Sequence, residues 1–309
     1  MSDILLVVVP VFLVIGAGYL AAWRGIIAPE GVDGLMKFAQ SIAVPMLLFR
    51  AISTLDLAAA LDPRLLFAFY SGAVTGFGVG LLGARYLFGR PWEDAVAIGF
   101  VGLFSNSLLL GLPITERAYG ADALSANFAI IAFHAPFCYL LGITVMEMVR
   151  AQGTALAAIP GKVARAVLVN PLIIGVLAGF VVNLTGLPLP EPLTSALDLI
   201  ARAGIPAALF GLGGVLLRYK PAGDMRLILF IVAVSVMLHP TIVWFAGHAL
   251  GLPQGALRSA VITASVAPGV NAYLFADMYG RARRVAASAV LIGTACTLLS
   301  ASFWLWMLP

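Results

Sequence analysis

Residues 105–113 read SNSLLLGLP, and they lie inside an uncharged run from Ala95 to Thr115. The run is long enough to cross a bilayer as a helix. Its centre suits a helix poorly, because serine and asparagine side chains compete for backbone hydrogen bonds and Pro113 removes a donor. In hydrocarbon, irregular backbone persists only where protein or a water-filled cavity surrounds it. We therefore expect a broken helix at which something polar binds.

A second stretch has the same chemistry. Residues 267–273 read APGVNAY and place a Pro-Gly pair beside an asparagine inside another long apolar run. Two interrupted spans at matching positions of two halves are the best sequence pointer to the binding site of a transporter. The binding-site candidates at the two breaks are Ser105, Asn106, Ser107, Gly111, Pro113, Pro268, Gly269 and Asn271.

The composition places the chain in a membrane. Of 309 residues, 62% are hydrophobic and 10% are charged, so too little polar surface exists to cover a soluble globule. Cys138 and Cys296 lie in apolar runs, so we expect buried thiols and neither a disulfide nor a metal site. The 18 basic residues exceed the 14 acidic ones, but they fall at span ends, and nucleic-acid binding is not supported.

Charge-poor runs predict an all-α integral membrane protein with ten spanning helices. The expected spans lie near residues 4–23, 35–49, 65–87, 95–115, 123–146, 166–187, 193–217, 227–250, 259–279 and 285–308. The first is interpreted as a transmembrane helix, because it lacks the basic region and cleavage site of a signal peptide.

Short motifs recur about half a chain apart. DPRLL at 62–66 recurs as DMRLI at 224–228, GRP at 89–91 as GLP at 251–253, and YG at 119–120 as YG at 279–280. We infer two five-helix repeats, residues 1–150 and 166–309, joined by a short linker at 151–165. An odd number of spans in each repeat inverts the second copy in the membrane.

Basic residues predict the orientation. With the amino terminus outside, the cytoplasmic ends collect thirteen lysines and arginines, whereas the exterior collects four, namely Arg50, Arg64, Arg117 and Arg258. Cytoplasmic segments carry the excess of basic residues. Both termini should therefore face the exterior of an inner (plasma) membrane, and the linker should be cytoplasmic.

Several ordered blocks resemble the auxin efflux carrier family, which includes plant carriers and short bacterial members. The blocks are SNSLLLGLPITERAYG (105–120), ARAGIPAALFGLGGVLL (201–217), SVAPGVNAYLFADMYG (265–280) and ASAVLIGTACTLLS (287–300). The resemblance covers nearly the whole chain. It implies a scaffold domain, a transport domain and a crossing of the fourth and ninth helices at their broken centres. The long hydrophilic central loop of the plant carriers has no counterpart here.

Further candidates lie in the second and seventh spans. Pro45 and Pro206 either frame a cavity or only bend their helices, and Gln40 and Ser41 are polar residues just before the first of these prolines. Arg202 is an arginine inside an expected span, which by default suggests a functional role. The alternative is a surface pair with Asp198 one turn earlier.

Two histidines are also open to two interpretations. His134 and His239 can relay protons near neutral pH, or they can be buried structural residues. No catalytic motif or phosphate loop is present, so an intramembrane enzyme or a structural subunit is a minor hypothesis. No cofactor is expected.

The sequence favours a secondary transporter of small organic anions that works by alternating access. The resemblance suggests auxin-like acids or malate- and malonate-like acids. The alternative is a sodium- or proton-coupled carrier of the bile-acid symporter or antiporter type. The expected partners are the organic anion and the lipid bilayer, and a homodimer is left open.

Overall fold

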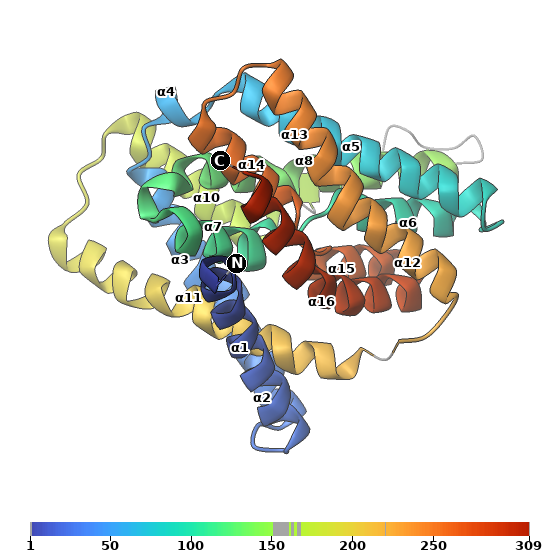
Figure 1. Ribbon diagram of the computed structural model, residues 1–309. Coiled ribbons are helices and arrows are strands. Elements are labelled where there is room, and N and C mark those ends of the chain that lie inside the picture. The colour runs from blue at the N-terminus through green and yellow to red at the C-terminus, as the bar shows by residue number, and fades with distance from the viewer. Residues whose placement is uncertain (1, 151–160, 162–163, 166–167, 220, 309) are drawn as a thin grey trace. The chain divides into compact units, whose positions relative to one another are not determined.

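The computed structural model describes residues 2–150, 161, 164–165, 168–219 and 221–308 (Figure 1). This part of the chain is helical and has no β-strand, and its one isolated bridge joins Ser105 to Pro268. The expected all-α class is confirmed. The linker expected at 151–165 lies almost entirely outside the described residues.

The chain divides into two compact units. The first contains residues 1–8, 61–164 and 219–309, and the second contains residues 9–60 and 165–218. Each unit therefore takes segments from both expected repeats. One of the divisions falls inside a helix, α1(Ser2–Trp23), between Val8 and Val9.

The first unit contains both broken spans. Beyond the start of α1, its helices are α5(Pro63–Tyr86), α6(Trp92–Leu103), η2(Ser107–Gly111), α7(Leu112–Tyr119), η3(Ala121–Ala123), α8(Leu124–Arg150), α12(Met225–Ala233), η5(Val234–Leu238), α13(His239–Ala249), α14(Gln254–Ala264), α15(Val270–Tyr279) and α16(Arg283–Met307). The second unit has α2(Pro29–Phe38), η1(Ala39–Ala43), α3(Val44–Ser53), α4(Leu57–Ala60), α10(Pro171–Thr185) and α11(Glu191–Arg218), with the rest of α1.

Seven helices in the described part are long and apolar enough to cross a membrane. They are Ile4–Trp23, Pro29–Ser53, Pro63–Tyr86, Ala121–Arg150, Glu191–Arg218, Met225–Ala249 and Arg283–Met307. Each overlaps one expected span. The three other expected spans correspond to the shorter apolar helix α10 and to the two broken segments, α6 with α7 and α14 with α15. The chain is thus a multi-pass membrane protein.

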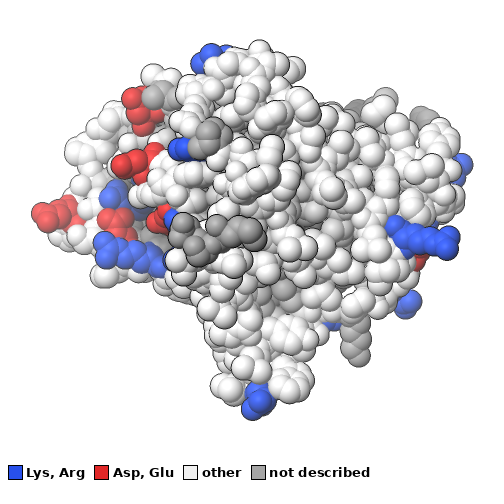
Figure 2. All heavy atoms as spheres, in the orientation of Figure 1, with Lys and Arg blue, Asp and Glu red and all other residues white. Residues whose placement is uncertain are grey.

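The surface agrees with this assignment. Figure 2 shows a face that is mostly uncharged, with lysine, arginine, aspartate and glutamate near its edges. No aspartate, glutamate, lysine or arginine is buried among the residues whose burial is described. An uncharged face is suited to contact with lipid, because charged groups are costly in hydrocarbon.

Glycines let the helices of the first unit approach closely. A Cβ atom added at Gly76 of α5 would lie 2.5 Å from the carbonyl oxygen of Gly102 on α6, and one at Gly102 would lie 2.7 Å from that of Gly76. α5 also packs along α13. Small residues at such contacts are typical of membrane helices, in which van der Waals packing replaces the hydrophobic effect.

The repeated motifs have the same structural roles in both halves. Asp62 caps α5 by accepting a hydrogen bond from the Arg64 N–H at 2.8 Å, and Asp224 caps α12 by accepting one from the Arg226 N–H at 3.1 Å. The side-chain hydrogen bonds from Arg64 hold the pKa of the Asp62 carboxyl below its ordinary value. Tyr119 and Tyr279 end α7 and α15, and each is followed by a glycine with positive φ.

Three π-helical turns precede prolines. η1, η2 and η5 each end two residues before a proline, which is the second residue of the next α-helix: Pro45, Pro113 and Pro240. A proline clashes with the carbonyl four residues earlier and gives it no donor. The wider π-turn accommodates this defect. The carbonyl oxygen of Val236, four residues before Pro240, accepts a hydrogen bond from the Ser300 hydroxyl at 2.6 Å.

Pro10 produces the same defect within α1, and an arginine compensates for it. Four residues before Pro10, the carbonyl oxygen of Leu6 accepts a hydrogen bond from Arg117 Nη2 at 2.9 Å, and Val7 accepts one from Arg117 Nε at 3.0 Å. The start of α1 is thereby bound to the end of α7 within the first unit. Pro10 itself lies two residues beyond the division between the units.

Candidate functional site

The two predicted breaks meet in the first unit. Between α6 and η2 the chain is non-helical at Phe104–Asn106, and between α14 and α15 it is non-helical at Ser265–Gly269. The Asn106 N–H donates to the carbonyl oxygen of Ala267 at 2.8 Å, and the Gly269 N–H donates to that of Phe104 at 2.8 Å. Each break therefore pairs with the peptide groups freed by the other, as a buried break requires.

Small residues make this approach possible. A Cβ atom on Gly269 would lie 3.2 Å from the Phe104 ring, and one on Gly293 of α16 would lie 2.8 Å from the Cδ of Pro268. A Cβ atom on Gly111 in η2 would lie 3.2 Å from the Cα of Thr263 on α14. A side chain at position 293 would therefore require Pro268 to shift, and one at position 111 or 269 would be tightly packed.

A buried amide joins three helices beside the breaks. Asn127 of α8 donates from Nδ2 to the Thr115 hydroxyl on α7 at 3.2 Å and to the Thr263 hydroxyl on α14 at 2.7 Å. All three side chains are fully buried. This cluster supports the site from its side and holds α7, the second half of one broken span, against α14, the first half of the other.

Polar atoms at the first break lack partners. Ser105, Asn106 and Ser107 are all buried, and Ser107 donates its hydroxyl to the Ser105 carbonyl oxygen at 3.3 Å. In contrast, Ser105 Oγ and Asn106 Nδ2 have no hydrogen-bond partner among the described residues. A buried unpaired donor costs about 1 to 3 kcal/mol. A ligand, an ion or an ordered water can supply the missing bond to such a group.

The second asparagine has a partner. Asn271, half-buried in the first turn of α15, accepts a hydrogen bond at Oδ1 from the Tyr139 hydroxyl at 3.2 Å. An amide whose oxygen is engaged has its nitrogen left as a donor. Tyr139 of α8 packs against the rings of Phe100 and Phe104. Both break asparagines thus offer an amide N–H donor, but Asn271 is held by Tyr139 through its oxygen whereas the Nδ2 of Asn106 is buried without a partner.

The meeting point is polar but uncharged. The continuous helical segment η2–α7 and the helix α15 each begin with N–H groups that have no partner within the segment, and helix amino termini carry partial positive charge. These ends lie next to the amides of Asn106 and Asn271. The arrangement offers hydrogen-bond donors and a favourable field to an anion.

The other predicted site residues belong to the second unit. Gln40 and Ser41 lie in η1, half-buried and exposed respectively, and Pro45 is buried at the start of α3. Arg202 and Pro206 are exposed on α11. α10 packs against α3 and η1. A role in binding for these five residues stays a prediction.

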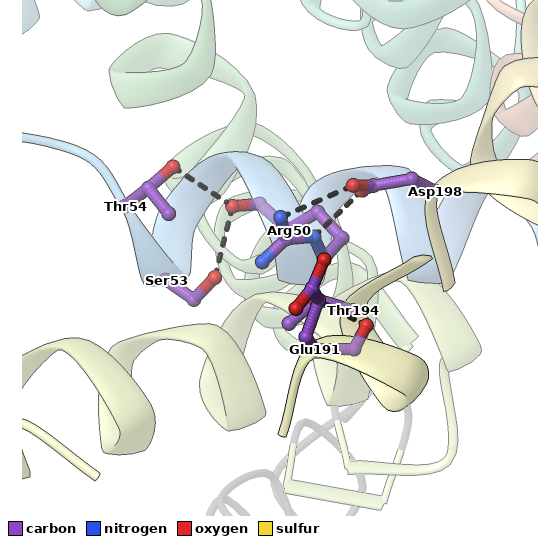
Figure 3. Close-up of polar contacts among 6 residues, drawn as sticks. All are labelled: Arg50, Ser53, Thr54, Glu191, Thr194 and Asp198. Atoms are coloured by element: carbon purple, nitrogen blue, oxygen red, sulfur yellow. Dashed lines mark hydrogen bonds and ion pairs between the residues drawn. The ribbon is translucent and has the colours of Figure 1, made fainter. Parts of the chain in front are cut away.

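An ion pair in the second unit differs from the one considered from the sequence. Arg50 of α3 donates from Nε and Nη2 to the two carboxylate oxygens of Asp198 at 2.7 and 3.2 Å. Figure 3 shows Arg50 reaching Asp198 beside Glu191 and Thr194. The pair connects α3 to α11, whereas an Asp198–Arg202 pair would lie within one helix. Arg202 is exposed one turn farther along α11.

Comparison with known proteins identifies the family. A model of the family described as "Membrane transport protein" matches residues 3–305. The chain belongs to this membrane transport family. The resemblance to auxin efflux carriers is thereby confirmed.

Two relatives illustrate the range of the family. The chain is 26% identical over 312 residues to a protein of Rhizobium meliloti (strain 1021) named "Putative malonate transporter", covering 100% of this chain and 97% of the relative. It is 20% identical over 342 residues to auxin efflux carrier component 8 of Arabidopsis thaliana, covering 92% of each. The chain is therefore similar over 92% or more of its length to one protein named for malonate transport and to one named for auxin efflux.

Sequence reasoning missed two residues that this family member places at the breaks. Tyr139 contacts Asn271, and Thr297 of α16 accepts a hydrogen bond at Oγ1 from the Ala267 N–H at 2.8 Å. Both lie in ordinary apolar helices. The available signal was their place in the helix that follows each broken span.

Proposed function

We propose that this protein is a secondary transporter of small organic anions that works by alternating access. Membrane transport follows from the family. The anion and the mechanism are the proposed steps. The names of the two relatives, one for malonate and one for auxin, support a carboxylate.

The observation that carries the proposal is the pair of buried donors without partners at the first break. Ser105 Oγ and Asn106 Nδ2 lie beside the backbone pairing of Asn106 with Ala267. A carboxylate accepts up to about four hydrogen bonds. Binding of one carboxylate oxygen to each donor would remove the cost of leaving both unpaired.

The groups that surround the two breaks favour a negatively charged ligand. None of the aspartate, glutamate, lysine and arginine side chains whose burial is described is buried, so the helix amino termini and the amides provide the local field. Donors and positive helix ends stabilise an anion and disfavour a cation. No catalytic role is assigned to the site, because the matching family is described as a membrane transport protein.

The finer architecture is part of the proposal. We expect ten spans in two inverted five-helix repeats, with the two broken helices crossing near mid-membrane and both termini outside an inner (plasma) membrane. The shared aspartate caps, glycine turns and paired breaks support the repeat. The two compact units support a scaffold and a transport domain.

A thermal-shift screen on purified protein tests the substrate class. Malonate, malate and indole-3-acetate should raise the unfolding midpoint, because a ligand at one hundred times its Kd stabilises the bound state by about 2.7 kcal/mol. Malonamide, which has the same skeleton without charge, is the control. Equal shifts with malonate and malonamide, or none with any acid, would count against an anion site.

Flux measurements separate the proposal from its rivals. In proteoliposomes, uptake of the anion identified by the screen should persist when potassium replaces sodium. Strict dependence on sodium would favour a cation-coupled carrier of the bile-acid symporter type. No flux of any anion would favour the hypothesis of an enzyme or structural subunit.

A further inference from the structure

Each broken segment is held by one side chain from the helix that follows it. His134 of α8 lies with Nε2 3.1 Å from the carbonyl oxygen of Ser105, 29 residues earlier. Thr297 of α16 accepts at Oγ1 from the N–H of Ala267, 30 residues earlier, at 2.8 Å. The two contacts occupy matching places in the two halves.

The contact of His134 fixes the peptide unit directly before Asn106. The carbonyl of that unit belongs to Ser105 and meets the histidine ring, while its N–H belongs to Asn106 and donates to Ala267 at 2.8 Å. A peptide unit is planar and rigid. Fixing both of its polar ends therefore fixes the Cα from which the unpaired Asn106 amide projects.

The surroundings of His134 favour a neutral ring. A carbonyl oxygen accepts only, so Nε2 carries a proton, and in the neutral ring Nδ1 is left as an acceptor. Nδ1 lies 3.8 Å from the Cys138 thiol on its own helix. The titratable groups facing the ring from α5 and α13 are Tyr70, in stacked contact, and His239, whose ring packs against the same Phe69 ring as that of His134. No carboxylate is buried there to stabilise an imidazolium.

Thr297 holds the second break by accepting a hydrogen bond at its hydroxyl oxygen. Its hydroxyl proton is donated to the Gly293 carbonyl oxygen of α16 at 3.0 Å. An oxygen lone pair is therefore left to accept from Ala267. Thr297 is fully buried, as is Ala267. One break is thus held through a carbonyl and the other through an N–H.

We propose that His134 and Thr297 are paired positioning residues, which hold the two broken segments so that the donors of Asn106 and of the α15 amino terminus converge on one anion. His134 acts as a neutral hydrogen-bond donor and carries no transported proton. The convergence on an anion rests on the proposed function. The holding of the two segments does not depend on it.

The test uses conservative pairs on the full-length protein in detergent. Hydrogen exchange read by mass spectrometry should be faster for residues 104–110 in His134→Ala and for residues 265–271 in Thr297→Val. His134→Gln and Thr297→Ser retain a donor and a hydroxyl, and they should exchange like the wild type. Control substitutions are His248→Ala and Thr241→Val, because the side chains of both residues make exposed hydrogen bonds to carbonyls of their own helix.

Binding of malonate, measured by calorimetry, gives the second measurement. We expect His134→Ala and Thr297→Val to weaken binding about 5- to 30-fold, as for one lost hydrogen bond. The Kd of His134→Gln for malonate should stay within about 3-fold of the wild-type Kd at every pH from 5 to 8. If protonation of His134 were part of binding, the two Kd values would diverge as the pH changes.

The outcomes separate the two proposals. Wild-type exchange in both His134→Ala and Thr297→Val would overturn the inference, as would a His134→Gln variant that binds as weakly as His134→Ala. If the wild type binds no carboxylate, the proposed function fails while the exchange data still test the inference. The glutamine and serine variants keep this test decisive if the alanine or valine variants fail to fold.

Discussion

Substitution of the two break asparagines, Asn106 and Asn271, should weaken anion binding in both cases but change the free energy of unfolding in opposite directions. Asn106 Nδ2 is buried without a partner, whereas Asn271 Oδ1 accepts the Tyr139 hydroxyl. Asn106→Ala therefore removes an unpaired donor, and Asn271→Ala creates an unpaired hydroxyl. Both variants should weaken anion binding by about 1 to 3 kcal/mol, the cost of losing a polar partner.

The stability changes follow from the same contacts. Relief of an unpaired buried donor is worth about 1 to 3 kcal/mol, and it is offset by about 1 kcal/mol of lost packing. We expect Asn106→Ala to raise the free energy of unfolding of the ligand-free protein by up to about 2 kcal/mol. Asn271→Ala should lower it by about 0.5 to 1.5 kcal/mol, because a net hydrogen bond is lost.

Thermal unfolding in detergent without ligand, together with calorimetric titration of malonate, measures both quantities. Ser105→Ala is a nearly isosteric check, since Ser105 Oγ is also unpaired, and it should not lower the midpoint. Asn183→Ala is the control for a structural amide, because Asn183 bonds to the carbonyl oxygens of Ile52 and Leu55. A midpoint for Asn106→Ala as low as that for Asn271→Ala would refute the reasoning.

Three further predictions concern the scaffold and the topology. A reporter active only in the cytoplasm should be silent when fused to the carboxyl end and active when inserted near Gly153; the reverse would overturn the orientation. Arg117→Gln should cost about 0.5 to 1.5 kcal/mol more with Pro10 present than in Pro10→Ala, in which the helix satisfies its own carbonyl; equal costs in a thermal double-mutant cycle would refute this compensation. Gly76→Ala should lower the unfolding midpoint, whereas Gly78→Ala, whose added Cβ meets no atom within 4 Å, should not; equal midpoints would show that the close contact tolerates a methyl group.

The breaks were predictable because their cause is local. Serine, asparagine, glycine and proline act on their own backbone, so SNSLLLGLP and APGVNAY indicated non-helical segments without knowledge of the fold. The pairing of Ser105 with Pro268 was not predictable in register. It depends on which peptide groups remain free after both helices end, and a shift of one residue leaves the same local sequence.

The partner of Asp198 is determined by tertiary packing and not by spacing along its own helix. An aspartate and an arginine four residues apart on a helix suggest a pair worth about 0.3 to 0.5 kcal/mol. Arg50 comes from a helix 148 residues away and makes two hydrogen bonds to the carboxylate. A bidentate pair is stronger than a single contact, and nothing in the sequence placed α3 beside α11.

Helix boundaries were misjudged where hydropathy was used alone. The sixth span was expected at 166–187, but α10 runs over Pro171–Thr185, because Asn170 caps it and Pro171 occupies its first position. The Asn-Pro pair was a signal of a helix start that was present in the sequence. The spans before and after it were closer to expectation, since charged residues limited them on both sides.

The structure also explains why stabilising packing and unpaired groups occur in the same unit. Gly76 and Gly102 bring α5 and α6 into close contact, and Asn127 joins three helices through fully buried bonds. This packing can support a non-helical crossing whose donors are not satisfied by protein. If those donors were paired within the protein, the unit would be more stable, but an anion would then have to break existing bonds to enter. If the proposed function holds, the unpaired state of Asn106 is a cost in stability that favours binding.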